Sequence, residues 1–132
     1  LMADESVTDG RSLIDIIRRE AADLVKVKVM KQGGFLRTRA MIDCAAAAGL
    51  RVVIGHGFGL TPSTLAEAAL AATSDAVVDG CEAVGPLKMA GDIVAAPVCL
   101  DAGVLRLTDA PGLGADVDAA EIRRYRLDDR TR

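Results

Sequence analysis

Apolar and polar residues alternate strictly over residues 24–30, which is the period of a β-strand with one buried face. The valines of this segment point to one side of the strand and its lysines point to the other. Apolar residues three and four positions apart predict a helix over residues 11–22, capped by Thr8 or Asp9. Residues 1–3 have the composition of the end of an earlier strand.

The same alternation of strand and helix continues along the middle of the chain. Gly49 follows a helical pattern at the place where a C-terminal glycine is favoured, and Thr61 with Pro62 predicts the start of another helix. The predicted elements are a helix over residues 36–48, a strand over 52–55, a helix over 61–73 and a strand over 76–79. This order predicts an α/β fold with a parallel sheet and crossover helices.

The pattern changes after Gly85 and Pro86. Two apolar segments flank a turn at residues 101–103, which is typical of a β-hairpin, and a short helix is expected near the end of the chain. The predicted elements are strands over residues 96–100 and 104–108, and a helix that starts at Asp118 or Ala119 and ends near Tyr125. We expect three parts, residues 1–90, 91–127 and a frayed tail over 128–132.

Composition narrows the class of protein. The chain has 132 residues, 51% of them hydrophobic and 27% charged, which favours one folded domain and excludes disorder. With 2% aromatic residues and a net charge of −3, a nucleic-acid surface is not expected. The longest uncharged run, residues 52–66, is too short to cross a bilayer, and early acidic residues argue against a signal peptide. No membrane partner is therefore expected.

The three cysteines, Cys44, Cys81 and Cys99, lie 37 and 18 residues apart. That spacing matches no common metal site, and the odd number argues against a disulfide framework. Reduced thiols in a cytoplasmic protein are therefore expected.

Lys26 and Lys28 share one face of the strand over residues 24–30. If this is an edge strand, the two side chains lie in solvent. If the strand is central, burial and mutual repulsion would lower the pKa of a lysine toward neutrality, where it can act as a base. The sequence leaves both interpretations open.

Further polar residues follow the predicted strands at the carboxyl edge of the sheet, where α/β proteins build their sites. Asp4 and Glu5 close the first strand, although they are also suited to the start of a helix. His56, the only histidine, lies among three glycines after the strand over 52–55, and Glu82 follows the last strand. His56 can be a structural residue or a ligand contact, and the glycines around it match no common phosphate-binding motif.

Several segments in order carry a family resemblance. The segments are LMADES (residues 1–6), ADLVKVKVMKQGG (22–34), GPL (85–87), DIV (92–94) and PGLG (111–114). Together they resemble the enolase superfamily, in its branch of muconate lactonizing enzyme and mandelate racemase-like proteins. The resemblance implies the C-terminal part of a (β/α)7β TIM-like barrel, with strands five to eight in residues 1–90. Residues 91–127 would then return to a capping domain that, with the first four strands, is absent from this sequence.

The resemblance also implies a chemistry. Members of the family remove a proton next to a carboxylate and form an enolate that Mg²⁺ stabilises. Asp4 would be one of three metal carboxylates, and Lys28 the sixth-strand acid or base. Lys26, His56 and Glu82 would contact a small-molecule carboxylate substrate. The remaining ligands would come from the N-terminal half of the same enzyme, a cytoplasmic homo-oligomer, and the chain alone would be inactive.

Some residues depart from patterns within the family. Gly59 stands where muconate-type members often have a glutamate, and Glu82 begins a segment where dipeptide epimerases carry an Asp-x-Asp. Lys28 occupies the strand that carries an aspartate in members with a His–Asp pair, so His56 lacks that partner. We therefore expect a racemase, epimerase or cycloisomerase, and the sequence does not identify its substrate. A dehydratase or lyase of the same superfamily, and a non-catalytic flavodoxin-like binding module, are the alternatives.

Overall fold

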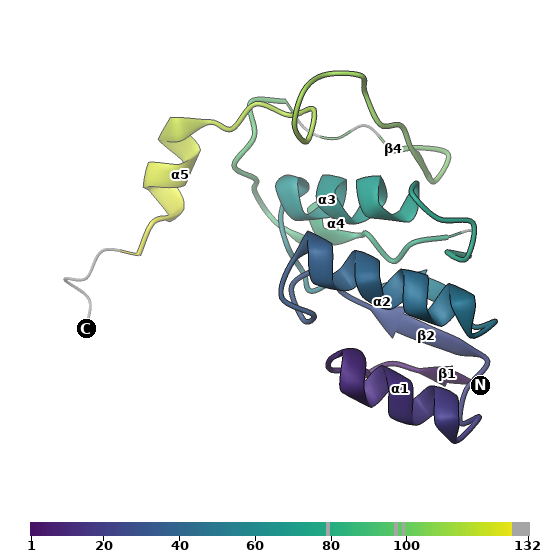
Figure 1. Ribbon diagram of the computed structural model, residues 1–132. Helices are drawn as coiled ribbons and strands as arrows, with labels where there is room; N and C mark the ends of the chain where they lie inside the picture. Colours follow the sequence, from purple (N-terminus) through teal and green to yellow (C-terminus); the bar gives the residue numbers. More distant parts are fainter. Residues whose placement is uncertain (79, 97, 99, 128–132) are drawn as a thin grey trace.

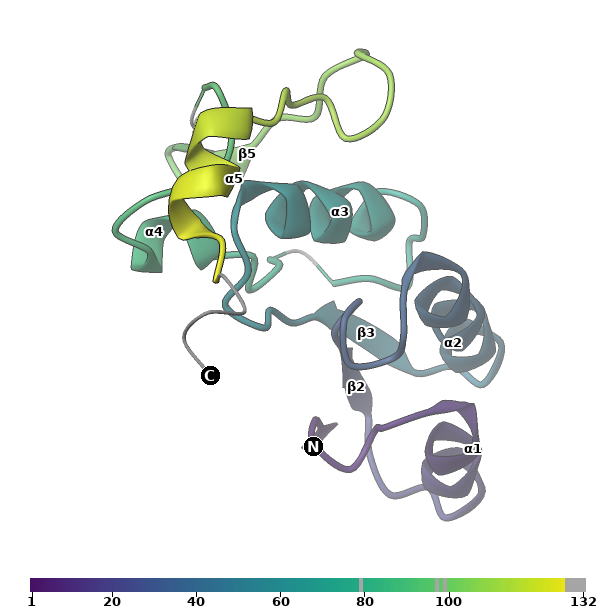
Figure 2. The same ribbon diagram turned by 90° about the vertical axis from the view of Figure 1, so that its left-hand side faces the viewer.

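The computed structural model describes residues 1–78, 80–96, 98 and 100–127. A parallel sheet with the strand order β1-β2-β3 forms its centre. Its strands are β1 (Met2–Ala3), β2 (Leu24–Val27) and β3 (Arg51–Ile54). The helices that follow them are α1 (Gly10–Arg18), α2 (Phe35–Ala47) and α3 (Thr61–Ala71). Figures 1 and 2 show the three helices side by side along one face of the sheet, as the predicted alternation of strand and helix requires.

The last third of the chain has a different organisation. It contains α4 (Gly85–Lys88), an antiparallel pair formed by β4 (Leu100–Asp101) and β5 (Val104–Leu105), and α5 (Ala119–Tyr125). Asp118 caps α5 by accepting hydrogen bonds from two backbone N–H groups. Figure 1 shows α5 apart from α1–α3, and none of its side chains is buried. The described part of the chain has no helix with the length and hydropathy that crossing a membrane requires.

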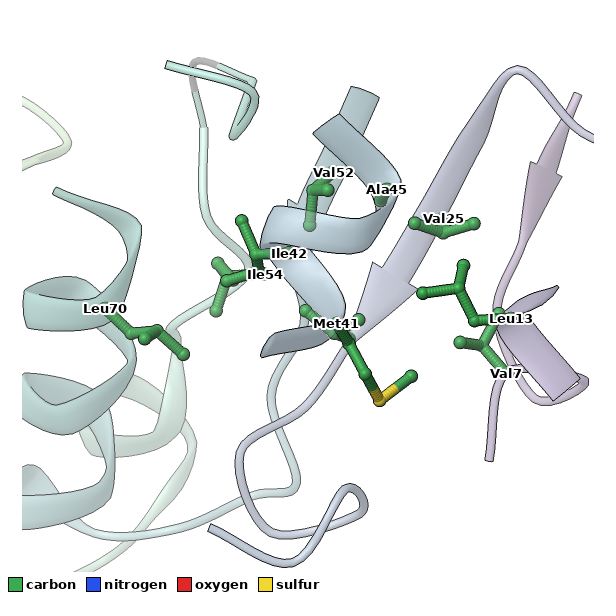
Figure 3. Close-up of a cluster of buried hydrophobic side chains, with 10 residues drawn as sticks. Val7, Leu13, Val25, Met41, Ile42, Ala45, Val52, Ile54 and Leu70 are labelled. Carbon is green, nitrogen blue, oxygen red and sulfur yellow. The ribbon is translucent and has the colours of Figure 1, made fainter. Parts of the chain in front are cut away.

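The hydrophobic core lies between the sheet and the helices. Val25 (Figure 3) and Val27 of β2 are both fully buried in a cluster with residues of the helices. The other members of the core are Val7, Leu13, Met41, Ile42, Ala45, Val52, Ile54 and Leu70. Because successive side chains of a strand alternate, Lys26 lies on the face of β2 away from this core. The helices thus cover one face of the sheet, and the opposite face carries the lysines.

Two of the early elements are shorter than predicted. β2 ends at Val27 instead of residue 30, because the backbone N–H of Lys28 donates to Gln32 Oε1 and leaves the strand ladder. α1 ends at Arg18 instead of residue 22, and Glu20 then takes a left-handed conformation with φ 48°. Asp9 is the N-cap of α1 and forms a reciprocal pair of hydrogen bonds with Ser12. α2 agrees with its predicted bounds to one residue, and Gly49 after it has φ +78°.

Later elements also differ from prediction. Leu60, not Thr61, is the N-cap of α3, because the Thr61 hydroxyl and N–H both donate to the Asp92 carboxylate. Within residues 76–78, the described part of the predicted strand over 76–79, there is one isolated parallel bridge, between Val77 and Val52. In the predicted hairpin, β5 ends at Leu105 instead of residue 108. Some predictions fall on residues outside the described part of the chain. These residues are Asp79 of the predicted strand, Pro97 and Cys99 of the predicted hairpin, and 128–132 of the predicted frayed tail.

Candidate active site

The carboxyl ends of the parallel strands bring the predicted polar residues together. Asp4 directly follows β1, and Lys28 directly follows β2. Glu82 is held beside the end of β3, because its N–H donates to the carbonyl of Ile54 at 3.0 Å. The sequence prediction of a polar group at this edge agrees with this arrangement.

Ion pairs connect these side chains into one group. Lys28 Nζ donates to Glu5 Oε1 at 2.6 Å and lies 2.9 Å from Asp4 Oδ1. Lys26 Nζ donates to Glu82 Oε2 at 2.7 Å and lies 3.5 Å from Asp4 Oδ2. A third lysine, Lys31, donates to the Asp4 carbonyl and lies 3.3 Å from its carboxylate. We call these six residues, Asp4, Glu5, Lys26, Lys28, Lys31 and Glu82, the lysine–carboxylate cluster.

The prediction that burial and mutual repulsion lower the pKa of these lysines is wrong for this arrangement. Hydrogen bonds to Glu5 and then to Asp4 raise the pKa of Lys28 above its ordinary value. A hydrogen bond to Glu82 likewise raises the pKa of Lys26, although burial opposes it. Burial acts to raise the pKa of Asp4, but hydrogen bonds from Lys28 and Lys31 outweigh it and hold that pKa low. Each lysine has its own carboxylate partner, so repulsion does not dominate.

The two lysines of the cluster pack against Gly55, the residue after β3. A Cβ at Gly55 would lie 2.8 Å from Lys26 Cδ, which is closer than packed carbon atoms allow, and 3.1 Å from Lys28 Cε, which is a tight contact. The aliphatic parts of both lysines therefore lie directly on the backbone that follows β3. Glycine at this position is explained by that close approach and not by a special backbone conformation.

His56 lies next to Gly55 but its ring is already engaged. Its Nδ1 is hydrogen-bonded to Glu67 Oε2, and its Nε2 lies 3.2 Å from the Gly59 carbonyl oxygen. The His56 side chain is 3% exposed and that of Glu67 1%. The substrate contact predicted for His56 would require one of these two contacts to break.

Sequence reasoning missed Lys31 and Glu67, and it placed Glu5 at the carboxyl edge of the sheet without giving it a specific role. Lys31 is brought back by the turn that ends β2, where its N–H donates to the carbonyl of Lys28. Glu67 could have been suspected, since it is the single charged residue in α3. Burial raises the pKa of Glu67 above its ordinary value, and its hydrogen bond with His56 opposes that rise.

A pocket opens beside the cluster. It is lined by His56, Phe58, Glu82, Val84 and Lys88. The Lys88 ammonium lies 5.0 Å from the centre of the Phe58 ring, within range of a cation–π interaction. Glu82 belongs both to this pocket and to the cluster, so a ligand in the pocket would lie next to Lys26.

The described residues do not by themselves form a complete metal site. No three of their His, Cys, Asp and Glu side chains are grouped so that they could hold a metal ion. Asp4 presents a carboxylate that is 30% exposed, yet three lysines surround it. Mg²⁺ prefers several oxygen ligands in octahedral geometry, so Asp4 fits as one ligand of a larger set.

Comparisons with known proteins agree with this architecture. A family model described as "Enolase C-terminal domain-like" matches residues 1–122. A chloromuconate cycloisomerase of Cupriavidus pinatubonensis is 35% identical over 125 residues, 95% of this chain and 34% of that protein. An N-succinyl-L-Arg/Lys racemase of Bacillus cereus is 33% identical over 120 residues, 89% of this chain and 31% of that protein.

A solved structure gives the same result in three dimensions. Muconate lactonizing enzyme from Pseudomonas putida superposes with a TM-score of 0.89 at 29% identity, over 94% of this chain and 34% of that one. The chain thus spans about a third of the length of the relatives that it matches.

Proposed function

The chain belongs to the Enolase C-terminal domain-like family, and from that membership we propose that it forms the C-terminal part of an isomerase that removes a proton next to a carboxylate. The resemblance seen in the sequence and the α/β fold that it implied are confirmed. Its relatives include cycloisomerases and a racemase, which favours an isomerase over a flavodoxin-like binding module. Racemisation, epimerisation and cycloisomerisation are the reactions proposed here.

The observation that carries the proposal is the pair of lysines on the open face of the sheet, beside Asp4. We assign proton transfer to Lys28, which lies at the end of its strand and whose side chain is 16% exposed. Lys26 is less exposed, at 9%, and is bonded to Glu82. It is suited to hold its charge and bind the substrate carboxylate, while Glu82 fixes its position. His56 and Glu82 both line the pocket beside the lysine–carboxylate cluster.

Asp4 is the proposed contribution of this chain to a Mg²⁺ site. When bound, Mg²⁺ would supply positive charge that stabilises the enolate. The other oxygen ligands would come from the N-terminal part of the enzyme, so a Mg²⁺ titration of the 132-residue chain should detect no site tighter than about millimolar. A tighter site in this chain would contradict the assignment of Asp4 as one ligand among several.

The N-terminal part of such an enzyme has a place to bind. β1 pairs with β2 alone among the described strands, and its other edge is open. Leu1 beside it is 82% exposed and Met2 is 43% exposed. We propose that residues 1–90 complete a barrel with that part, that residues 91–127 reach its capping domain, and that the whole enzyme is a homo-oligomer. Free thiols at Cys44 and Cys81 are consistent with the cytoplasm.

Proton exchange tests the proposed reaction. The whole enzyme is incubated with Mg²⁺ in deuterated water and a panel of carboxylates, including N-succinyl-arginine, N-succinyl-lysine and muconates, and the products are followed by NMR. We expect deuterium next to the carboxylate, or a cyclised product, and loss of both on removal of Mg²⁺. Loss of water from the substrate would identify a dehydratase instead. No exchange and no product with any acid of the panel would contradict the proposal.

A further inference from the structure

Three segments converge on the ring of His56. The ring belongs to the segment after β3, and its hydrogen-bond partner Glu67 belongs to α3. Gly85, the first residue of α4, packs so closely that a Cβ there would lie 2.3 Å from His56 Nε2 and 1.9 Å from the Gly59 oxygen. The ring therefore lies where a loop and two helices meet, and its side chain is 3% exposed.

The partners of the ring determine where its protons lie. The Gly59 carbonyl can only accept, so Nε2 must carry a hydrogen to bond with it. The second oxygen of Glu67, Oε1, is buried and has no hydrogen-bond partner among the described residues. A buried charged oxygen without a partner is far more costly than a neutral one. The geometry therefore favours a protonated Glu67 whose Oε2–H donates to Nδ1.

The surroundings of the pair agree with this state. Burial raises the pKa of Glu67, although its hydrogen bond with His56 opposes that rise. Burial therefore favours the neutral form of Glu67. With Nε2–H and Oε2–H in place, the pair has no net charge.

The His56 ring is connected to the lysines through Gly55, because a single peptide bond joins His56 to Gly55, which the two lysines contact. His56 follows Gly55, whose backbone supports the aliphatic parts of Lys26 and Lys28. A further contact fixes the same loop, since a Cβ at Gly57 would lie 1.9 Å from Met30 Sδ. Movement of the His56 ring would therefore move the surface on which the two lysines lie.

We propose that His56 and Glu67 form a net-neutral positioning pair that fixes residues 55–60 and, through Gly55, the placement of Lys26 and Lys28. The proposal rests on the proposed function in one respect, that Lys28 is the proton-transfer residue. It assigns His56 a positioning role in place of a direct substrate contact. Its experiments use neither substrate nor Mg²⁺, so their outcome is independent of whether the enzyme catalyses isomerisation.

The first experiment reads the proton positions by NMR of the protein labelled with ¹⁵N-histidine, at pH 7. The ring signals are assigned by their loss in His56→Gln. We expect a proton on Nε2 that exchanges slowly with water and no proton on Nδ1. A ring proton on Nδ1, protons on both nitrogens, or an Nε2 proton in rapid exchange would overturn the neutral pair.

The second experiment separates positioning from simple structural support. It compares Glu67→Ala and Glu67→Gln, with Asp43→Asn as control for loss of an exposed carboxylate that pairs with Arg39. The readout is the NMR shifts of the Lys26 and Lys28 methylene groups. Glu67→Ala should shift them, whereas Glu67→Gln, whose amide can also donate to Nδ1, should preserve both these shifts and the Nε2 proton. Asp43→Asn should leave them unchanged.

Two results would overturn the positioning role. In one, Glu67→Ala lowers the melting temperature but leaves the lysine signals at their original shifts. In the other, Glu67→Gln remains folded yet moves the lysine signals or loses the Nε2 proton. Because Gln has nearly the size of Glu, the second variant decides the question even if Glu67→Ala does not fold.

Discussion

The lysine–carboxylate cluster and the His56–Glu67 pair contain similar groups in opposite surroundings. In the cluster, the Glu5 and Glu82 side chains are 76% and 56% exposed, the lysines are 9–19% exposed, and every lysine has more than one carboxylate within 4 Å. In the pair, both side chains are at most 3% exposed and each has one main partner. Solvent near the cluster allows partners to be exchanged at small cost, whereas the buried pair would leave a polar group unsatisfied.

This difference suits the lysine–carboxylate cluster to proton transfer and the His56–Glu67 pair to structural support. A residue that transfers a proton must change partners during the reaction, and only the cluster allows that without breaking the interior. A residue that holds a loop in place benefits from partners that it cannot exchange. If burial, rather than residue type, divides the two roles, substitutions in the two regions should differ in their effects.

The largest expected effect on stability is that of Glu67→Ala. Removing this side chain leaves His56 Nδ1 without a partner and opens a cavity, so the free energy of unfolding should fall by roughly 2–4 kcal/mol. Glu5→Ala, in the cluster, should give no measurable change. Denaturant unfolding of both variants of the whole enzyme measures the contrast, and equal losses of stability would remove the distinction between the two regions.

A smaller effect is expected of Gly85→Ala, which adds a methyl group where α4 meets the His56 ring. The new Cβ would lie 1.9 Å from the Gly59 oxygen, so the backbone must shift, at about 1–3 kcal/mol for an overpacked site. Gly10→Ala is the matched control, because nothing lies within 4 Å of a Cβ there. Thermal unfolding should show a lowered midpoint for Gly85→Ala alone, and an unchanged midpoint would argue against close packing on the ring.

The smallest expected effect is a dependence of stability on pH. Burial raises the pKa of Glu67 above its ordinary value of 4.5, so folding favours the protonated form. The contribution is present below pH 4.5 and is lost as pH rises through the raised value, with a slope of at most about 1.4 kcal/mol per pH unit. The stability of the wild type relative to Glu67→Gln should therefore fall over that range. A constant or rising difference would show that Glu67 is ionised in the folded protein.

Much of the fold was predictable because it depends on short-range patterns. The alternation around Lys26 and Lys28 identified both the strand and the face that carries the lysines. The exact ends were not predictable, since β2 stops where the side chain of Gln32 takes the N–H of Lys28. Such a hydrogen bond depends on how the following turn folds, which no residue pattern records.

The members of the candidate site were easier to predict than their charges. Asp4, Lys26, Lys28 and Glu82 follow from strand order alone. Glu82 neutralises the charge of Lys26 from 56 positions away, which depends on the packing of distant segments. Without this partner, a lowered pKa of Lys26 is the natural expectation. The His56–Glu67 pair was missed for the same reason, because α3 must fold back over the loop before the two side chains meet.

The central claim is that Lys28 of the lysine–carboxylate cluster moves the proton and that the buried His56–Glu67 pair supports it. The most direct measurement is the rate at which the whole enzyme exchanges the substrate α-proton with deuterated water, compared among wild type, Lys28→Ala and Glu67→Gln, with Mg²⁺ binding measured in parallel. Lys28→Ala should lose roughly 10²–10⁴-fold in exchange rate, as expected for removal of an acid–base residue, while exchange by Glu67→Gln and Mg²⁺ binding are largely preserved. Exchange by Lys28→Ala at the wild-type rate would contradict the account.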